Sequence, residues 1–166
     1  MRAFFDFEFI EGGSAFVMEP ISIGIVREDG EEYYAEFAGV DWSKANDFVL
    51  REVKPFLNPV QYSSSKTKIT EEIKEFVGEY PEFWAYFADY DWVLMCQLFG
   101  NMTDLPNTWP KLCLDIKQYM WHLDIDKSEI PVQNPHAHLA ISDARWNRDV
   151  FDYLYRTMKG ETGGAA

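Results

Sequence analysis

A short apolar segment near the N-terminus contains two carboxylates, and it constrains the fold more than any other part of the sequence. Residues 3–10 alternate as a β-strand does, which places Asp6 and Glu8 on one face and three phenylalanines on the other. An ordinary half-buried strand with a solvated polar face is one interpretation. Phe4 and Ile10 share the face of the carboxylates, however, which predicts that this face is covered. Because neighbouring buried carboxylates repel each other, a covered pair favours a bound metal ion.

The length and composition predict one aromatic-rich domain. The chain has 166 residues, of which 47% are hydrophobic and 17% aromatic, so disordered, collagen-like and coiled-coil compositions are excluded. We expect a single domain over residues 1–158. Residues 159–166 are small and polar, and we expect them to form a disordered tail.

The charge balance and the cysteine content limit the kinds of partner and compartment. The 28 acidic residues outnumber the 15 basic ones, which leaves a net charge of -13. Such a chain lacks bulk positive charge, so binding a nucleic acid would require local cations or metal ions. The longest uncharged apolar run, Trp92–Gly100, is far shorter than the ~20 residues that span a bilayer. With two widely separated cysteines and no signal peptide, we expect a cytoplasmic protein without a membrane partner.

The first third of the chain is predicted to form an antiparallel three-stranded meander. The strands span Ala3–Ile10, Ile21–Arg27 and Glu32–Phe37, and the turn sequence Glu28–Gly30 joins the last two.

The remainder alternates between helices and strands. Apolar residues recur at helical spacing from Ile69 to Tyr80, which predicts an amphipathic helix that ends near Gly78. The other expected elements are a helix over Asp41–Leu57 with Ser43 as its N-cap, a strand over Glu82–Ala88, a helix over Asp89–Phe99, a short strand over Leu112–Ile116, a helix over Lys117–Asp124 and a long helix over Leu139–Met158. This order predicts an α/β fold with a mixed five-stranded sheet flanked by helices.

Further acids lie on the apolar faces of predicted helices. Asp91 aligns with one apolar stripe and Asp89 with another, so the periodicity does not choose between them, and the helix dipole alone explains an acid at a helix start. Asp143 lies on the core-facing side of the last helix, where a carboxylate is unfavourable unless it is paired or binds a metal. The alternative for Asp143 is a salt bridge to Arg145 or Arg148.

His138 precedes Asp143 by five residues at the start of the same helix. A cap or surface role explains such a histidine, but beside acids it can act as a general base near neutral pH. His136 and His138 together could indicate zinc, which we disfavour because no cysteine or third histidine stands at ligand spacing.

Taken together, these residues resemble the three motifs of the DEDDh 3′-to-5′ exonucleases, a branch of the ribonuclease-H-like superfamily. The motifs are Asp6-x-Glu8, Asp91 in YDWVLMCQLFG and His138-xxxx-Asp143 in HLAISDAR. The resemblance covers nearly the whole chain and favours Asp91 over Asp89. It is closest to the small mycobacterial-type exoribonucleases, whose patterns stand here at Asp6–Glu11, Ile21–Gly24, Glu28–Gly30, Glu32–Ala35, Tyr90–Asp91 and Cys96–Leu98.

The resemblance implies a ribonuclease-H-like sheet, in which parallel strands adjoin the meander, and a two-metal hydrolytic mechanism. The carboxylates of Asp6, Glu8, Asp91 and Asp143 would hold two Mg²⁺ or Mn²⁺ ions. His138 would deprotonate the attacking water, and Glu8 would also contact the terminal 3′-hydroxyl. The implied reaction removes nucleoside 5′-monophosphates from 3′ ends, of RNA more than of DNA. Because relatives in this family often form dimers, a homodimer is a further expectation.

The acidity of the chain shapes what is expected of substrate binding. Affinity should come from the metals, from base stacking and from a few local cations, which favours single-stranded ends. Phe9 and Ile10 follow Glu8 and are candidates for contact with the terminal base, although core packing is the alternative for Phe9. The candidate cations, of which the two lysines could equally lie in a solvated loop, are Lys66, Lys68, Arg145 and Arg148.

Three other functions fit part of the sequence. A 3′-5′ exonuclease acting mainly on DNA shares the same motifs. A non-enzymatic acidic protein that binds a basic partner fits the net charge, but it would spread its acids over the surface rather than among apolar residues. An inactive relative is disfavoured because all four acids and the histidine are present. The leading hypothesis is a metal-dependent 3′-5′ exoribonuclease.

Overall fold

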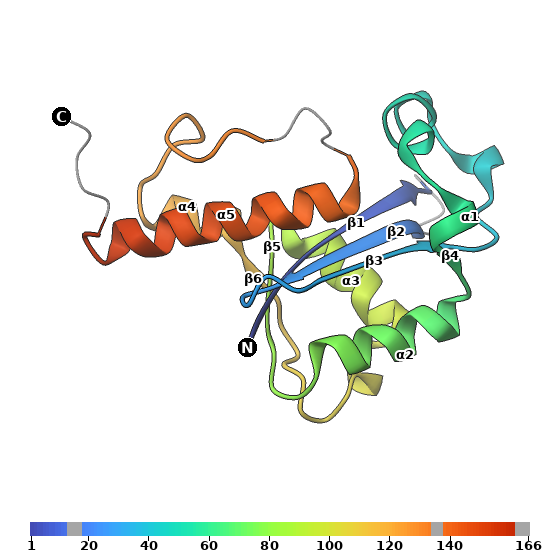
Figure 1. Cartoon of the computed structure of the whole chain (residues 1–166), viewed down its shortest axis with the longest axis horizontal. Helices are drawn as coiled ribbons and strands as arrows, with labels where there is room; N and C mark the ends of the chain where they lie inside the picture. The colour runs from blue at the N-terminus through green and yellow to red at the C-terminus, as the bar shows by residue number, and fades with distance from the viewer. Residues whose placement is uncertain (13–17, 134–137, 162–166) are drawn as a thin grey trace.

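One central sheet separates two helical layers (Figure 1). The computed structural model describes residues 1–12, 18–133 and 138–161. Helix α5 covers one face of the sheet with α4 beside it, whereas α2 and α3 cover the other face (Figure 1). The strand order is β4-β3-β2-β1-β5-β6, so β1 lies inside the sheet with side chains buried on both of its faces. The predicted α/β class, with a mixed sheet between helices, is confirmed.

The predicted meander is formed by the three longest strands, which pair antiparallel. They are β1 (Arg2–Glu11), β2 (Met18–Arg27) and β3 (Glu32–Phe37). The parallel strands are β5 (Glu82–Ala85), β6 (Leu114–Asp115) and β4 (Ser63–Ser64). The sheet therefore has a sixth strand beyond the five expected, because the two serines of β4 carry no strand periodicity that a sequence pattern could detect.

Four predicted helices form close to their expected bounds, namely α2 (Lys66–Val77), α3 (Ala88–Phe99), α4 (Ile116–His122) and α5 (Ala140–Met158). A short helix that was not expected, α1 (Pro59–Tyr62), precedes them. Tyr80 does not belong to the α2 stripe, because Gly78 ends the helix at φ +73° and leaves Tyr80 73% exposed. In the described parts of the chain, no helix is long and apolar enough to cross a membrane. Of the expected tail, residues 162–166 lie outside the described residues.

The predicted continuous helix over Asp41–Leu57 is wrong. The segment contains three short helical pieces instead: 3₁₀ turns at Trp42–Lys44 and Lys54–Phe56 and a π-helical turn at Val49–Val53. The first piece is capped by Asp41, whose carboxylate accepts the backbone N–H of Ser43, so the expected cap is one of the capped residues. Pro55 lacks an N–H and interrupts regular helical hydrogen bonding near the end of the segment.

Gly24 allows α5 to approach the sheet closely. A Cβ built on Gly24 would lie 2.4 Å from the Cα of Ile141, so any larger residue would displace the first turn of the helix. Gly24 is paired with Asp6 across β1 and β2. The close approach therefore brings the N-terminal part of α5, including Asp143, next to the carboxylates of β1.

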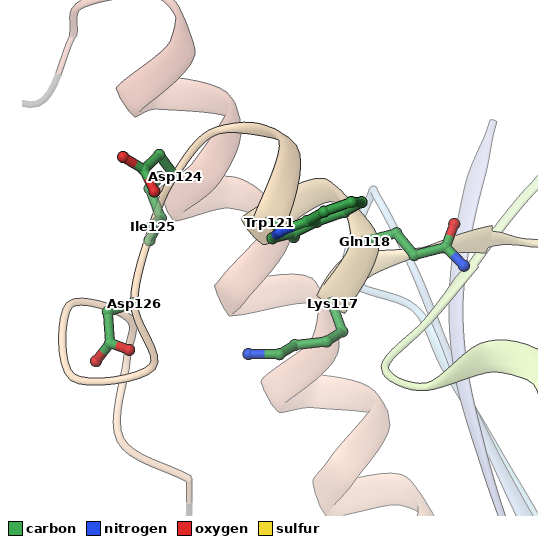
Figure 2. A pocket seen from close by; sticks show the side chains of 6 residues that line it. All are labelled: Lys117, Gln118, Trp121, Asp124, Ile125 and Asp126. Atoms are coloured by element: carbon green, nitrogen blue, oxygen red, sulfur yellow. The ribbon is translucent and has the colours of Figure 1, made fainter.

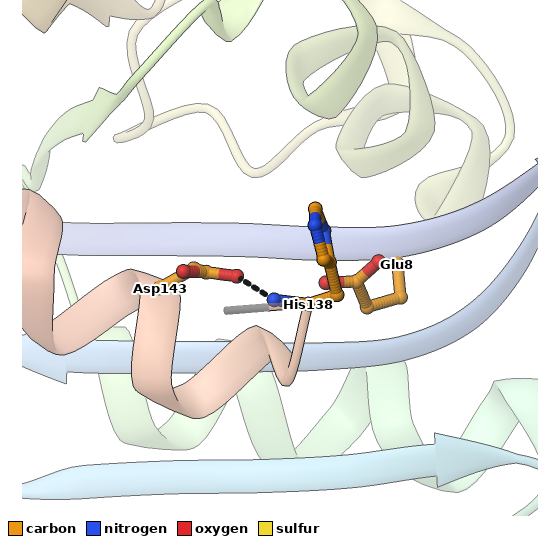
Figure 3. A group of neighbouring side chains, drawn as sticks. All are labelled: Glu8, His138 and Asp143. Atoms are coloured by element: carbon orange, nitrogen blue, oxygen red, sulfur yellow. Dashed lines mark hydrogen bonds between the residues drawn. The ribbon is translucent and has the colours of Figure 1, made fainter. Parts of the chain in front are cut away.

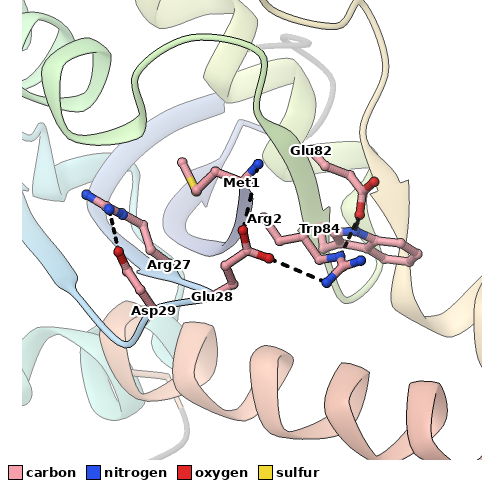
Figure 4. A network of polar contacts seen from close by, with 7 residues as sticks. All are labelled: Met1, Arg2, Arg27, Glu28, Asp29, Glu82 and Trp84. Atoms are coloured by element: carbon pink, nitrogen blue, oxygen red, sulfur yellow. Dashed lines mark hydrogen bonds and ion pairs between the residues drawn. The ribbon is translucent and has the colours of Figure 1, made fainter.

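Charged side chains around the start of β1 are paired with opposite charges (Figure 4). The Nε of Arg2 lies 3.0 Å from Oε1 of Glu82, and its Nη1 lies 3.4 Å from Oε2 of Glu28. The Trp84 indole donates a hydrogen bond of 2.6 Å to Glu82, and the terminal amine of Met1 lies 3.7 Å from Glu28. These contacts tie the start of β1 to β5 and to the turn that follows β2.

Candidate active site

A cavity of about 260 Å³ lies beside β1, where β5 ends and α5 begins. All five predicted DEDDh residues line it, although they come from well-separated segments. The lining residues are Asp6, Phe7, Glu8, Phe9, Tyr86, Phe87, Tyr90, Asp91, Gln133, His138, Asp143, Trp146 and Asn147. The structure therefore brings the predicted acids and histidine together.

The site lies where β1 extends beyond its parallel neighbour. Strand β5 ends at Ala85 and pairs with β1 only as far as Phe4, so the backbone of β1 beyond that point needs other partners. The N–H of Phe7 donates to Oδ1 of Asp91 at 2.8 Å, and the carbonyl of Phe5 accepts from Nδ2 of Asn147 at 2.9 Å. The hydrogen bonds that pair these backbone groups of β1 thus position one residue of α3 and one of α5 at the cavity.

Asp91, and not Asp89, is the acid of α3 that reaches the site. Asp91 is 6% exposed and lines the cavity, whereas Asp89 is exposed to solvent. The tie that the periodicity left open is therefore resolved by the hydrogen bond from Phe7 to Asp91.

Asp143 and His138 are held together at the start of α5 (Figure 3). The backbone N–H of His138 donates to Oδ2 of Asp143 at 2.7 Å, and Nε2 of Gln133 donates to Oδ1 at 2.7 Å. His138 has a φ of +71°, and its imidazole meets the ring of Phe48 edge-on with centroids 4.9 Å apart. Ligand atoms of Glu8, His138 and Asp143 all lie within 4.8 Å of one another, which is close enough for them to share a metal ion.

Among the described residues that line the cavity there is no lysine or arginine, and His138 is the one side chain that can carry a positive charge beside the carboxylates. The predicted alternative of a salt bridge for Asp143 is wrong, because Arg145 pairs with Glu32 and Arg148 with Asp149. Burial raises the pKa of Asp6 well above its usual range, and the charges of Asp91, Glu8 and Asp143 raise it further.

The pKa values of the other three acids are raised as well. Burial and the charges of Asp143 and Asp91 raise the pKa of Glu8 to about 8. Burial raises the pKa of Asp91 to about 7, although the hydrogen bond from Phe7 opposes the shift. Burial also raises the pKa of Asp143 against the hydrogen bonds from Gln133 and His138 and the charge of the His138 imidazole. Buried oxygen donors that repel one another fit a hard divalent cation, which would relieve the repulsion.

The residues predicted to contact the terminal base are separated by the structure. Phe9 lines the cavity, where its ring stacks on Tyr90 with centroids 5.7 Å apart and planes 19° apart. Ile10 is 2% exposed and packs with Ile21 and Val49 in a small core cluster, away from the cavity lining. Ile10 therefore contributes to the core; it follows the register shift between Glu8 and Phe9 in the pairing of β1 with β2, which interrupts the regular alternation.

None of the four predicted cations lines this cavity. Lys66 donates from Nζ to the carbonyl oxygen of Gln97 at 2.7 Å, and Lys68 lies 3.6 Å from Glu72 within α2. Both lysines lie in the first turn of α2 rather than in a loop. Arg145 forms a two-point contact with Glu32 on the outer side of α5.

Some lining residues carry no signal that sequence analysis could use. Gln133 belongs to an irregular segment, and Phe87 adopts a left-handed backbone (φ +57°) at the junction of β5 and α3 that leaves it 60% exposed. A larger cavity of about 460 Å³ lies between α4 and residues 124–126, beside Trp121 (Figure 2). It lacks the converging carboxylates, so the smaller cavity is the better candidate for chemistry.

The mixed sheet between two helical layers is the ribonuclease-H-like fold that the sequence predicts, and the five residues of the DEDDh resemblance line one cavity in it. Among solved structures, exonuclease I matches with a TM-score of 0.69 at 14% identity, over 94% of this chain and 40% of that one. A zinc-bound form of the E. coli exonuclease I–ssDNA complex matches with a TM-score of 0.69 at 12% identity, over 96% of this chain and 41% of that one. The chain thus spans about 40% of the length of these structures, and the likeness shows the fold.

Curated proteins give a closer match over the full length. The 3′-5′ exoribonucleases of two Mycobacterium tuberculosis strains, CDC 1551 and H37Rv, are each 39% identical over 171 residues, which covers 99% of both chains. No family model matches the chain. At this identity and coverage, the chain belongs to the family of these 3′-5′ exoribonucleases.

Proposed function

We propose that this protein is a metal-dependent 3′-5′ exoribonuclease that hydrolyses the terminal phosphodiester of RNA and releases nucleoside 5′-monophosphates. The main support is that four carboxylates from separate segments converge with a histidine in one cavity whose described lining contains no lysine or arginine. Such an arrangement is destabilising without a bound cation, so its presence is best explained by a function that requires one.

The residues that would hold the metal are Asp6, Glu8, Asp91 and Asp143, and their oxygen donors favour two Mg²⁺ or Mn²⁺ ions. When bound, such ions activate water and stabilise the charge that develops on the leaving 3′ oxygen. Asp91 has one oxygen engaged by the Phe7 N–H, and Asp143 has both engaged by neutral N–H donors, so their orientations are defined before any ion binds.

His138 would take the proton from the attacking water. Its imidazole lies with Glu8 and Asp143 at the cavity, and neighbouring carboxylates stabilise the imidazolium that forms. The water oxygen then bonds to phosphorus while the P–O3′ bond breaks. The phosphate therefore stays attached to the 5′ oxygen of the released nucleotide. Glu8 would also contact the terminal 3′-hydroxyl, which would restrict the reaction to chain ends.

The terminal base would stack on the aromatic wall of the cavity. Phe9 and Tyr90 already stack on each other, and Tyr90 is 49% exposed, so an aromatic surface is available beside the acids. A cavity of about 260 Å³ favours a single-stranded end over a duplex. Because the predicted cations lie outside the cavity, phosphate recognition would depend on the metal ions.

RNA is the proposed substrate because the family members at 39% identity are named exoribonucleases. DNA is the second candidate, since one structural neighbour is E. coli exonuclease I in complex with a dT13 oligonucleotide. We also propose a homodimer, as the DEDDh resemblance implies. We further propose a cytoplasmic location, which agrees with the two free cysteines. Light scattering of the purified protein tests the dimer.

The test of function is a time course on RNA and DNA oligonucleotides of one sequence, labelled at the 5′ end, with Mg²⁺, Mn²⁺ or EDTA. The expected result is a ladder that shortens from the 3′ end, faster on RNA, and that disappears with EDTA and in Asp143→Ala. Faster shortening of DNA than of RNA would contradict an exoribonuclease and indicate a deoxyribonuclease. Intact substrate in every lane, from protein with a cooperative thermal transition, would contradict an exonuclease and favour an acidic protein that binds a basic partner.

A further inference from the structure

The segment that follows α4 returns to the candidate active site and is anchored on the way. Ile130 is 5% exposed and packs in the core beside α5. The carbonyl oxygen of Pro131 accepts a hydrogen bond of 2.8 Å from the indole N–H of Trp146. Trp146 is 6% exposed and packs against Tyr86 with ring centroids 4.9 Å apart. The backbone two residues before Gln133 is therefore held in place by the core.

This anchored segment places the neutral side chain of Gln133 among the carboxylates of the cavity. Gln133 lines the cavity, and its Nε2 donates to Oδ1 of Asp143 at 2.7 Å. The other oxygen, Oδ2, accepts the backbone N–H of His138 at 2.7 Å. Because the two donors, a side-chain amide and a backbone N–H five residues apart, bind different oxygens, together they fix the orientation of the Asp143 carboxylate.

That orientation matters because Asp143 must face Glu8. Ligand atoms of the two residues, with His138, lie within 4.8 Å of one another, and the two carboxylates come from α5 and β1 (Figure 3). Like charges at this separation repel, and a freely rotating Asp143 would turn its carboxylate away from Glu8. Two fixed donors oppose that rotation.

We propose that Gln133 is a positioning residue that orients the Asp143 carboxylate toward Glu8, so that the two side chains can share a divalent ion. The inference rests on the function proposed above. An amide suits the role because it donates a hydrogen bond without a positive charge, whereas a lysine or arginine would neutralise Asp143 and compete with the metal. Hydrogen-bond partners of metal-binding carboxylates typically account for roughly 10–100-fold in metal affinity or activity.

The test compares the full-length protein with Gln133→Met and Gln133→Asn. Methionine keeps the length of the side chain but removes the donor, and asparagine keeps the amide but draws it back by one methylene. Gln118→Met is the matched control, because Gln118 is an exposed glutamine on α4, beside the cavity of Trp121. Calorimetric titration with MnCl₂ measures metal affinity without substrate, thermal melts of the metal-free proteins establish that they fold, and steady-state kinetics on an RNA oligonucleotide give kcat and KM.

Both Gln133 variants are expected to bind Mn²⁺ roughly tenfold more weakly and to have a roughly tenfold lower kcat, with KM for RNA unchanged. The Gln118→Met control should match the wild type in all measurements. Unchanged Mn²⁺ affinity in a folded Gln133 variant would overturn the inference, and so would a loss confined to KM, which would make Gln133 a substrate contact. If the wild type hydrolysed no RNA, the proposed function would fail, yet weaker Mn²⁺ binding by the variants would still support the role of Gln133.

Discussion

The two ends of β1 differ in how their charged side chains are paired. At its start, Arg2 lies between Glu28 and Glu82, so every charge there has an opposite partner (Figure 4). A few residues further on, Asp6 and Glu8 face two more carboxylates, with no lysine or arginine among the described residues that line the cavity. At the start of the strand, here called the compensated end, the charges have opposite partners. Further along, in what is here called the uncompensated cluster, the four acids face one another. The proposed divalent ions would complete the second cluster and account for this difference.

The largest expected effect is the loss of hydrolysis when an acid of the uncompensated cluster is removed. Asp6→Ala deletes a ligand from the centre of the cavity and should lower kcat by on the order of 10³-fold or more. It also removes a repelling charge, so the metal-free variant should melt no lower than the wild type. Kinetics and thermal melts check both expectations. Asp29→Ala, which removes the partner of Arg27 at the compensated end, is the control. Full activity of Asp6→Ala would contradict the assignment of the metal site.

The next effect distinguishes His138 from the acids around it. His138→Ala removes the proposed base but leaves the four carboxylates, so kcat should fall by roughly 10²-fold while KM and Mn²⁺ affinity change little. Steady-state kinetics with calorimetric titration separate these quantities. An unchanged kcat would remove the general-base role, and a collapse of Mn²⁺ affinity would make His138 a ligand instead.

A third effect should appear in the pH dependence of stability. The pKa of Glu8 rises from 4.5 to about 8 on folding, and that of Asp91 from 3.8 to about 7. Because the folded state binds these protons more tightly than the unfolded state, their contribution to stability is full below about pH 4 and is lost as the pH rises to about 8.

The melting temperature of the metal-free protein should therefore fall by roughly 5–10 °C between pH 5 and pH 8. Added Mg²⁺ should restore most of the loss at pH 8 and have little effect at pH 5, because only the ionised carboxylates bind it. Scanning calorimetry with and without Mg²⁺ makes this measurement. A flat pH profile, or equal stabilisation by Mg²⁺ at both values, would remove the contrast between the two ends of β1.

The smallest effect belongs to the compensated end. Arg2 is partly exposed and its guanidinium also lies 5.1 Å from the ring centroid of Phe151. Arg2→Ala should lower the free energy of unfolding by about 1 kcal/mol and leave kcat and Mn²⁺ affinity unchanged. Urea denaturation and kinetics check the two parts. A large loss of activity would mean that the two ends of β1 are functionally coupled, contrary to their separation here.

The acids of the site could be predicted from sequence because regular periodicity determines which face of a strand or helix each side chain occupies. Asp6 and Glu8 share a face of β1, and Asp143 lies on the buried face of α5, as the patterns indicated. Periodicity alone left Asp89 and Asp91 equivalent. The structure separates them through the Phe7 N–H, which is free only because β5 is shorter than β1.

Other features could not be predicted because they depend on contacts between distant or irregular segments. Lys66 was a candidate substrate contact, but its partner is a carbonyl oxygen at the far end of α3. Gln133 reaches Asp143 only because Trp146 holds the neighbouring backbone, and an irregular segment has no repeat that would reveal this. The segment after Asp41 has too few regular hydrogen bonds for a helical pattern to describe it.

Binding of divalent metal by the acids of β1, α3 and α5 can be tested by anomalous diffraction from crystals grown with Mn²⁺. We expect anomalous peaks within coordination distance of the carboxylates of Asp6, Glu8, Asp91 and Asp143, and their loss in crystals of Asp143→Ala. Crystals that show no peak among these four carboxylates at saturating Mn²⁺ would contradict it.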